Sequence, residues 1–243
     1  MGHKAAAEVP KNRVVDLGKH SMTQTDTRRS TPALAAAQHQ KKRKPNAHIT
    51  FVREFIRNPA ATAAIAPSSR KLCERMIEGF DVASCRTVVE YGPGSGVMTR
   101  VVLERIPKGW EEQGRKFLAI EYNPTMAAVV HAEFPRATVI NDSAANVERI
   151  IGEHGIAPGS VDLVVSGLGW ASFPPNVTTE ILEATARVLK PGGEFRTFAY
   201  HIGLVKKSAW HLRAEMKRLF GDVRTTRSVW ANLPPAFVYV CKK

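Results

Sequence analysis

The sequence has no long apolar run, and aromatic residues make up only 7% of its 243 residues. A membrane-spanning helix needs about 20 consecutive, predominantly apolar residues, so the sequence excludes one. The N-terminal residues include no apolar stretch of the kind that a secretory signal contains, and we expect no such signal. The three cysteines, Cys73, Cys85 and Cys241, form no even set and lack metal-ligand spacing. We therefore expect a reducing compartment, no disulfide framework and no metal site.

Acidic residues are scarce relative to basic ones. The chain has 35 Lys and Arg residues against 22 Asp and Glu residues, which gives a formal net charge of +13. The first 50 residues hold 10 basic and 3 acidic side chains, or +7, so the remaining 193 residues hold 25 and 19, or +6. The excess belongs partly to the N-terminal segment and partly to the body of the protein. Such a balance predicts an anionic partner, namely nucleic acid, a lipid headgroup layer or polyphosphate.

Residues 1–45 are rich in small and polar side chains and poor in large apolar ones. They cannot bury enough apolar surface to offset the entropy of ordering, so we expect a disordered basic tail. Residues 46–80 are expected to form an N-terminal helical extension. The spacing of apolar residues predicts an amphipathic helix over 47–58 and a second helix over 67–79.

From residue 81 to 243, short β-rich runs alternate with helical runs, which predicts an α/β fold with a doubly wound, mostly parallel sheet. The last two strands are separated by a Leu-Pro-Pro turn and would form an antiparallel hairpin, giving seven strands in all. The expected strands are 86–91, 116–121, 137–140, 161–166, 194–200, 222–230 and 236–241. The expected helices are 97–105, 124–133, 144–152, 176–189 and 206–219, and the fourth would end in Pro191-Gly192-Gly193.

The most specific motif is the run VVEYGPGSGVMTR at 88–100, in which a β-branched strand leads into a glycine-rich turn and then a helix. Glycine lets the backbone turn sharply and approach a ligand closely, because no Cβ intervenes. The third glycine that a dinucleotide fingerprint requires is replaced by Val97, and the lysine of a nucleoside-triphosphate loop is absent. The pattern is instead E-x-G-x-G-x-G, formed by Glu90, Gly92, Gly94 and Gly96.

Two further acids follow the next two strands. Glu121 ends the second expected strand, and Asp142, followed by Ser143, comes directly after the third. Because the carboxyl ends of parallel strands meet at one edge of a sheet, we expect Glu90, Glu121 and Asp142 to border one crevice. A carboxylate at the position of Glu121 can accept hydrogen bonds from two ribose hydroxyls.

This order of motifs resembles motif I and the following acids of the class I S-adenosylmethionine-dependent methyltransferases. The resemblance implies a Rossmann-like fold and S-adenosylmethionine as cofactor, with S-adenosylhomocysteine as product. It also implies that Glu90 acts on the ammonium end of the cofactor, that Glu121 binds its ribose and that Asp142 meets the adenine amino group. The cofactor-binding residues that we expect are Glu90, Gly92, Gly94, Gly96, Glu121, Asp142, Ser143, Ser166 and Ser68, of which Ser68 could also cap a helix.

The wider pattern is similar to the bacterial phospholipid N-methyltransferases, which are related to the ribosomal RNA adenine dimethyltransferases. It spans about residues 47–205 and consists of FVREFIRNPAATAAIAPSSRKL, VVEYGPGSGVMTR, AIEYNP, VVSGLGWASFP and LKPGGEFRTFAY. The resemblance implies methyl transfer to the amine of phosphatidylethanolamine and its methylated forms. N-methylation of an ornithine lipid is the alternative within the same group, because SGLGWAS departs from the SSLP-like form of one branch.

A polybasic run followed by an amphipathic helix has the composition of an interfacial membrane anchor. Each Lys or Arg near an anionic leaflet contributes about 1 kcal/mol. We therefore expect a cytoplasmic protein bound peripherally to the inner face of the cell membrane, although the same helix could pack on the catalytic domain or cover the cofactor pocket. The residues expected at the membrane or headgroup are Lys41, Lys42, Arg43, Lys44, Phe51, Arg53, Arg57 and Lys206.

An ethanolamine-type amine is a cation at neutral pH and has to lose a proton before it accepts a methyl group. Tyr200 and His201 end the fifth expected strand and are the candidate proton acceptors, since histidine titrates near neutrality. Trp170 could face the methylated ammonium through cation–π attraction, as could Phe173. Packing of the three aromatic side chains and an ordinary loop position for His201 are the structural alternatives.

Adenine dimethylation of ribosomal RNA is the main rival activity. In that family the fourth strand leads into an Asn- or Asp-Pro-Pro-Tyr-like tetrad that holds the flipped adenine. Here the aligned residues, Ser166 to Trp170, lack the amide and the prolines and keep only the aromatic side chain. A membrane- or RNA-binding protein without catalytic activity is a second rival, against which the three intact acids argue.

Overall fold

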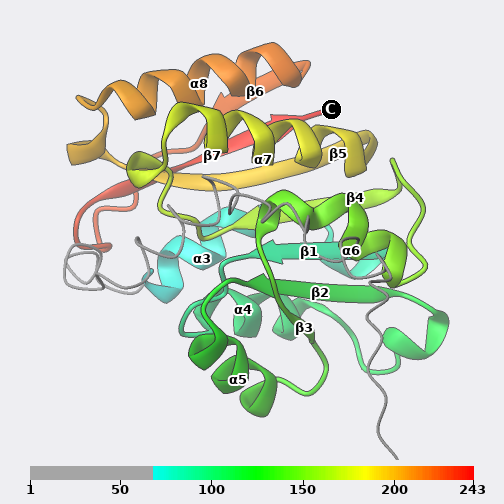
Figure 1. Cartoon of the computed structure of the whole chain (residues 1–243). Coiled ribbons are helices and arrows are strands. Elements are labelled where there is room, and N and C mark those ends of the chain that lie inside the picture. Colours follow the sequence, from blue (N-terminus) through cyan, green and yellow to red (C-terminus); the bar gives the residue numbers. More distant parts are fainter. Residues whose placement is uncertain (1–67) are drawn as a thin grey trace, which may run out of the picture. The chain divides into compact units, whose positions relative to one another are not determined.

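The computed structural model describes residues 68–243, in which seven strands form one sheet in the order β3-β2-β1-β4-β5-β7-β6 (Figure 1). Strands β1 to β5 run parallel, whereas β7 is antiparallel to both β5 and β6. The predicted fold class, a doubly wound and mostly parallel sheet with an antiparallel terminal pair, is confirmed. The strands are β1 (Thr87–Tyr91), β2 (Lys116–Glu121), β3 (Thr138–Asn141), β4 (Val161–Ser166), β5 (Leu189–Tyr200), β6 (Asp222–Thr225) and β7 (Ala236–Lys242).

Helices cover both faces of this sheet and bury a separate hydrophobic core on each. Neighbouring strand residues alternate between the two cores, so Val88 packs with α3, α4 and α5 while Val89 packs with α6, α7 and α8. A central strand buried on both faces is mostly apolar, which explains the runs Val88-Val89 in β1 and 163–165 in β4. The helices are α3 (Arg70–Ile77), α4 (Val97–Arg105), α5 (Pro124–Glu133), α6 (Val147–Glu153), α7 (Pro175–Val188) and α8 (Lys207–Leu219).

The Pro-Gly-Gly segment does not end a helix, as the sequence suggested. Helix α7 ends at Val188, and residues 189–193 are already part of β5. The register between β4 and β5 shifts between Val161 and Leu163, opposite this segment. A Cβ on Gly193 would lie 2.9 Å from the Val161 carbonyl oxygen, so only glycine permits this close approach. The glycines therefore belong to an irregularity inside the strand.

Two further expectations differ from the structure or lie outside it. The expected strand 222–230 is too long, because β6 ends at Thr225 and only an isolated bridge between Val229 and Ala236 continues the pairing. The expected tail over 1–45 and helix over 47–58 lie outside the described residues. Within residues 68–243, no helix has the length and apolar content needed to span a bilayer.

Helix α3 is attached to the sheet by one buried cation on β5. The Arg196 side chain is 5% exposed and pairs with Glu194, whose Oε2 lies 2.6 Å from Nη2. Its Nη1 donates hydrogen bonds to the carbonyl oxygens of Met76 and Glu78, where α3 ends. Helix carbonyls at a C-terminus have no partner within the helix, so a cation there both satisfies them and opposes the helix dipole.

Substitution of this arginine tests how much the attachment contributes. We expect Arg196→Met to lower the free energy of unfolding by about 3–5 kcal/mol, because it removes a buried cation and leaves the partly buried Glu194 carboxylate without its partner. Urea unfolding followed by circular dichroism measures the change. Arg224 is the matched control, since it also pairs with an acid two residues earlier on a strand but is exposed. Arg224→Met should cost less than about 1 kcal/mol, and equal losses in the two variants would contradict the assignment.

Candidate functional site

The carboxyl ends of the parallel strands lie level with one another at one edge of the sheet. Tyr91 at the end of β1 pairs with Ile120 of β2 on one side and with Ser166 of β4 on the other. The glycine turn leaves β1 at this edge, between the ends of β2 and β4. The Gly167 N–H donates to the Tyr91 carbonyl at 2.8 Å, which draws the chain after β4 against the turn.

The glycine turn has left-handed backbone geometry that residues with side chains rarely adopt. Gly94 has φ of 53° and Gly96 has φ of 77°. A Cβ on Gly96 would lie 2.3 Å from the ring of Phe134, so this position is closed by packing against the end of α5. A Cβ on Gly94 would meet no atom within 4 Å, so this position faces open space. Gly94 is therefore the part of the turn that lets a ligand approach the backbone.

Glu90 lies inside the protein with one carboxylate oxygen free. It is 1% exposed, and its Oε2 accepts a hydrogen bond of 2.8 Å from the Thr99 hydroxyl. Its Oε1 is buried without a hydrogen-bond partner among the described residues. The pKa of Glu90 is raised to about 8, mainly by burial and also by the nearby charge of Glu121, while the hydrogen bond from Thr99 opposes the shift. The side chain is thus protonated at neutral pH and could become a carboxylate beside a cation.

Glu121 is held in a fixed orientation by two backbone donors. Its Oε2 accepts the Gly94 N–H at 3.0 Å and its Oε1 accepts the Asn123 N–H at 2.8 Å. Each carboxylate oxygen has a second lone pair, so both can accept a further hydrogen bond. Asn123 also caps α5 by accepting the N–H groups of Thr125 and Met126, which fixes the local chain.

Asp142 and Ser143 lie beside Glu121 at the end of β3. The Asp142 carboxylate accepts the Ser143 N–H at 2.6 Å and the side-chain amide of Asn146 at 2.7 Å, and it forms an ion pair with Arg149. Ser143 caps a short 3-10 helix, η3 (Ala144–Asn146), by accepting the Ala145 N–H. These contacts hold Asp142 in place without burying it.

Two cavities open on either side of Gly92, which lines both. The first, which we call the acid-side cavity, has a volume of about 60 Å³ and includes Glu121, Asp142 and Ser143 with apolar walls. The second, which we call the aromatic cavity, has a volume of about 180 Å³. The acid-side cavity is lined by Gly92, Ile120, Glu121, Tyr122, Asp142, Ser143, Ala144, Leu168, Phe173, Val177 and Ile181. The aromatic cavity is lined by Ser68, Cys73, Met76, Gly92, Pro93, Gly94, Ser95, Val97, Met98, Gly167, Phe198 and Tyr200.

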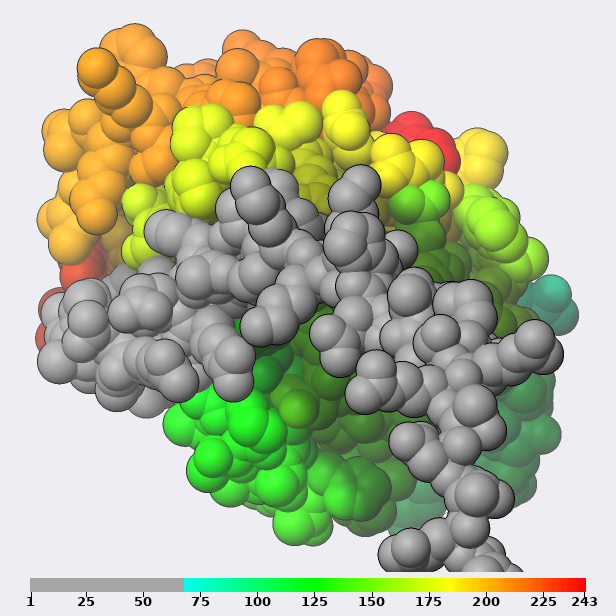
Figure 2. All heavy atoms as spheres, viewed as in Figure 1, coloured from blue at the N-terminus to red at the C-terminus, as the bar shows by residue number. Residues whose placement is uncertain are grey.

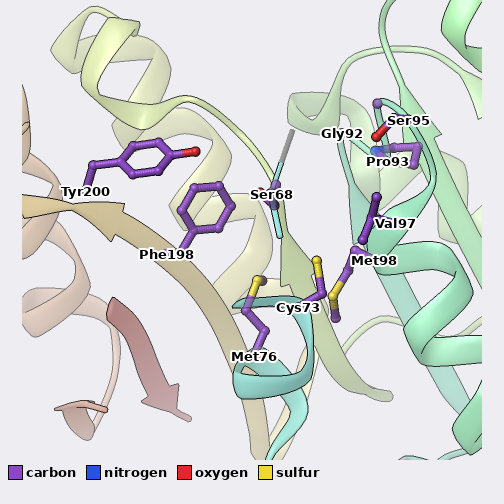
Figure 3. A pocket seen from close by; sticks show the side chains of 12 residues that line it. Ser68, Cys73, Met76, Gly92, Pro93, Ser95, Val97, Met98, Phe198 and Tyr200 are labelled. Carbon is purple, nitrogen blue, oxygen red and sulfur yellow. The ribbon is translucent and has the colours of Figure 1, made fainter. Parts of the chain in front are cut away.

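The aromatic cavity is formed by three elements and contains no charged side chain from the described residues. Figure 3 shows Phe198 and Tyr200 of β5 on one side, the glycine turn and the start of α4 on the other, and Cys73 and Met76 of α3 between them. The Tyr200 hydroxyl points toward Ser68 and the glycine turn (Figure 3). A cavity with aromatic, sulfur and hydroxyl groups suits a small group that is uncharged or carries a diffuse positive charge.

The Tyr200 hydroxyl is buried and has no hydrogen-bond partner among the described residues. Burial raises the pKa of Tyr200, and the nearby side chains of Ser68 and Asn232 oppose the shift without completing a hydrogen bond to the hydroxyl. A buried unpaired hydroxyl costs about 1–3 kcal/mol, so this group is available to a ligand. Tyr200 thus lines the cavity with an unpaired hydroxyl, and its catalytic role stays a prediction.

His201 and Trp170 do not line either cavity. His201 Nε2 lies 2.8 Å from the Ser228 hydroxyl, and its ring stacks on Trp230. Trp170 is 3% exposed, donates its indole N–H to Thr197 at 2.8 Å and belongs to the core that contains α7 and α8. Both side chains have structural partners, so their positions do not support the expected catalytic roles.

The remaining predicted residues are divided between the crevice and the protein surface. Ser68 lines the aromatic cavity, and the neighbouring Ser69 caps α3. Ser166 is fully buried, accepts the Leu168 N–H and lines neither cavity. Lys206 is exposed at the start of α8. The expected membrane residues Lys41 to Lys44, Phe51, Arg53 and Arg57 lie outside the described part of the chain.

Eight residues that line the aromatic cavity were not among the predicted site residues, and they include Cys73, Met76, Met98 and Phe198. Strand periodicity contained a signal for Phe198, since residues two apart on a strand share a face and Tyr200 was already a candidate. Helical spacing likewise places Cys73 and Met76 three residues apart on one side of α3. Neither pattern predicts that this face of α3 meets this face of β5, because that contact depends on how the helix is attached to the strand.

The chain is similar to known methyltransferases in sequence and in fold. A family model described as a methyltransferase domain matches residues 88–193. A curated relative, the ornithine lipid N-methyltransferase of Singulisphaera acidiphila, is 27% identical over 195 residues, which cover 79% of this chain and 94% of the relative. Solved structures at lower identity show the same fold.

An S-adenosylmethionine-dependent O-methyltransferase from Thermotoga maritima matches with a TM-score of 0.54 and 17% identity, over 77% of this chain and 70% of that one. The 16S rRNA N2 G1207 methyltransferase of T. thermophilus, solved with S-adenosylmethionine and guanosine, matches with a TM-score of 0.50 and 17% identity, over 72% of this chain and 38% of that one.

The crevice fits the cofactor that these proteins use. Glu90 lines neither cavity, but its buried free oxygen at the end of β1 suits a cation. The oriented Glu121 carboxylate suits hydroxyl groups, and the apolar walls of the acid-side cavity suit a flat ring. S-adenosylmethionine is therefore the cofactor. The family model, the curated relative and the shared fold all indicate a class I S-adenosylmethionine-dependent methyltransferase.

Proposed function

We propose that this protein transfers methyl groups to the amine of a membrane lipid headgroup, phosphatidylethanolamine or its methylated forms. The observation that carries the proposal is the aromatic cavity, which offers an amine a buried hydroxyl and two aromatic rings but no opposing charge. Similarity to an ornithine lipid N-methyltransferase over 94% of that relative's length supports a lipid amine as acceptor. The same similarity makes an ornithine lipid the second candidate substrate.

The residues around the glycine turn would hold the cofactor in the following way. Glu90 would take the ammonium group at its free oxygen, and Gly94 would allow the amino-acid end to approach the backbone. Glu121 would bind the ribose hydroxyls, with Asp142 and Ser143 at the adenine. When bound, S-adenosylmethionine supplies a methyl group on a positively charged sulfur that an amine lone pair can attack.

The aromatic cavity would select the neutral form of the acceptor amine. With the pKa of lysine, about 10.4, as a guide, removing the proton at pH 7 costs about 5 kcal/mol. A cavity without carboxylates does not stabilise the ammonium, so burial favours release of the proton to solvent as the amine enters. The described walls thus contribute to deprotonation through desolvation.

Tyr200 would orient the amine. Because burial raises the pKa of its hydroxyl, the side chain stays protonated and is not the base that the sequence suggested. Its oxygen can still accept a hydrogen bond from an amine N–H, which fixes the direction of the nitrogen lone pair. The rings of Phe198 and Tyr200, 5.4 Å apart, would face the ammonium that forms after each transfer, in the role expected of Trp170.

The position of Trp170 disfavours adenine as the acceptor. An adenine methyltransferase stacks the flipped base on the aromatic side chain that follows its fourth strand. Trp170 stands at the aligned position but packs against Phe173 and Phe195 inside the protein. It is not free to stack on a base, and we do not retain RNA methylation as a candidate function.

Proton release on cofactor binding tests the role of Glu90. Its pKa of about 8 means that the free protein holds a proton there at pH 7, and binding of a cation beside it favours the carboxylate. We expect binding of S-adenosylmethionine at pH 7 to release up to about one proton, measured by calorimetry in buffers of different ionisation enthalpy. Release should disappear in Glu90→Gln and persist in the control Glu112→Gln, an exposed site; equal release in both variants would remove Glu90 from this role.

The same group predicts a pH dependence of stability. Between its ordinary pKa of 4.5 and about 8, Glu90 binds a proton in the folded protein and not in the unfolded chain. Stability should therefore fall as the pH rises from about 4.5 to 8, with no further contribution above that. Urea unfolding across this range should show a flatter profile for Glu90→Gln.

Replacement of Tyr200 by Phe should separate catalysis from cofactor binding. We expect Tyr200→Phe to reduce kcat about 10- to 100-fold while the affinity for S-adenosylmethionine changes less than about twofold. The variant should also be slightly more stable, because an unpaired buried hydroxyl is removed. Glu121→Ala should do the reverse and weaken cofactor binding about tenfold or more. Unchanged turnover in Tyr200→Phe would show that its hydroxyl serves no part of the reaction.

The acceptor itself is identified by offering lipids and RNA to the purified protein. Vesicles of phosphatidylethanolamine, vesicles containing an ornithine lipid, vesicles of phosphatidylcholine alone and ribosomal RNA are incubated with methyl-labelled S-adenosylmethionine. We expect label in the first, as lipids with one to three added methyl groups by mass spectrometry. Label only in the ornithine lipid would select the second candidate, and label only in RNA would refute both. Glu121→Ala controls for contaminating activity.

A further inference from the structure

Exposed apolar side chains gather beside the end of β5. Among the described residues, seven large hydrophobic side chains are exposed, and the five most exposed come from residues 202–233. The other two, Met126 and Val129, lie on α5. We call the five side chains the apolar rim: Ile202, Val205, Trp210, Trp230 and Leu233, which are 68–86% exposed.

Hydrogen bonds and ring contacts join the segments that carry the rim. His201, in the short helix η5 (His201–Gly203), stacks on Trp230 and donates its backbone N–H to the Pro235 carbonyl. The Trp210 indole N–H donates to the Leu204 carbonyl at 2.8 Å. The rim is therefore one surface, and the start of α8 that carries part of it appears in orange at the left of Figure 2.

The loop before β7 is fixed from inside, so its apolar side chains are held outward. Asn232 is 1% exposed, accepts the Ser69 N–H at 2.9 Å and donates to the Pro234 carbonyl at 2.7 Å. Its neighbour Leu233 and the nearby Trp230 are directed to solvent at 76% and 73% exposure. Apolar surface held in water by an ordered loop is typical of an interaction site.

Unpaired cations surround the rim. Residues 201–235 contain seven basic and two acidic side chains, and both acids are paired, Glu215 with Arg218 and Asp222 with Arg224. On α8, Trp210 shares a face with Arg213 and Lys217, and these three line an open groove of about 530 Å³. The other five basic residues form no ion pair within residues 68–243: Lys206, Lys207, Arg213, Lys217 and Arg227.

We propose that the apolar rim and its five cations dock on an anionic lipid bilayer. Aromatic and aliphatic side chains ringed by Lys and Arg match the boundary between acyl chains and anionic headgroups. The placement has a functional consequence, which rests on the proposed function. Tyr200 directly precedes η5 and pairs with Ala236, three residues after Leu233, so the rim borders the strand end that lines the aromatic cavity. A docked rim would bring that cavity to the headgroup layer.

Tryptophan fluorescence tests the docking without any methyl transfer. The chain has four tryptophans, of which Trp110 and Trp170 are buried while Trp210 and Trp230 belong to the rim. The full chain is mixed with vesicles of phosphatidylcholine, with or without phosphatidylglycerol, neither of which offers an unmethylated amine. We expect a blue shift and protection from acrylamide quenching with the anionic vesicles only, reversed by salt. Trp210→Phe and Trp230→Phe should each remove part of the shift.

Vesicle sedimentation of double variants measures how much the rim contributes to the affinity for the bilayer. Trp230→Ser with Leu233→Ser should weaken binding to anionic vesicles about tenfold or more, and the control Met126→Ser with Val129→Ser should not. Replacing Lys206 and Lys207 by Gln should weaken it by a similar factor at low salt. A background in which residues 41–44 are Gln removes the polybasic run, and the rim effect should persist there.

Several outcomes would overturn the proposal. Sedimentation with vesicles without any change at Trp210 and Trp230 would place the contact elsewhere in the chain. Protection of these tryptophans by RNA alone, or loss of a dimer in light scattering of the Trp230→Ser/Leu233→Ser variant, would assign the rim to another partner. If the rim substitutions leave vesicle binding unchanged but the protein still methylates a lipid, docking through the rim is refuted and the proposed function stands. If that variant also loses turnover on a short-chain, water-soluble aminolipid, its substitutions have damaged the site or the fold rather than docking, and the rim loses its support.

Discussion

The crevice depends on two buried oxygen atoms that the fold leaves without hydrogen-bond partners. They are Oε1 of Glu90 and the hydroxyl of Tyr200, the only such side-chain atoms within residues 68–243. Each costs about 1–3 kcal/mol in the absence of a ligand, so the rest of the structure has to offset them. Unsatisfied groups of this kind are rare in folded proteins and indicate a site at which a ligand completes the hydrogen bonding. One lies on β1 and the other on β5, with β4 between these two strands in the sheet.

The electrostatics of the site follow from this separation. The acid-side cavity contains ionisable residues whose positions are fixed by backbone donors, as Glu121 is by Gly94 and Asn123. The aromatic cavity has no acidic or basic side chain among its described lining residues. One edge of the sheet therefore provides two different chemical surroundings. The glycine turn contributes to both cavities, because Gly92 lines each of them.

Much of the cofactor half could be predicted from the sequence, and the acceptor half much less. The bounds of β2, β4, α4 and α5 match those predicted, because their period and cap residues are local signals. Because neighbouring parallel strands end at the same edge of the sheet, the sequence alone places Glu90 and Glu121 at that edge. Trp170 differs, since a residue in a loop after β4 can turn to either face of the sheet, and only packing against Phe195 and Thr197 decides which.

The start of β5 is a second place where a local pattern gives the wrong structure. Its Pro-Gly-Gly segment has the composition that usually ends a helix. In the structure its glycine instead allows a close approach to the Val161 carbonyl, a contact between residues 32 positions apart. Distant contacts of this kind leave no periodic trace in the sequence. They therefore decide the features that local patterns do not, including the meeting of α3 with β5.

One face of β5 both attaches helix α3 to the sheet and lines the aromatic cavity. Arg196, Phe198 and Tyr200 lie two residues apart, so all three side chains point to the side covered by α3. The first attaches the C-terminal end of that helix, and the other two line the cavity with Cys73 and Met76 of the same helix. At the other end of α3, Asn232 accepts the Ser69 N–H and connects the helix to the loop that carries the rim. Helix α3 is thus held at both ends by buried polar side chains. Because Cys73 and Met76 lie between these two attachments, a change at either end would alter the shape of the aromatic cavity.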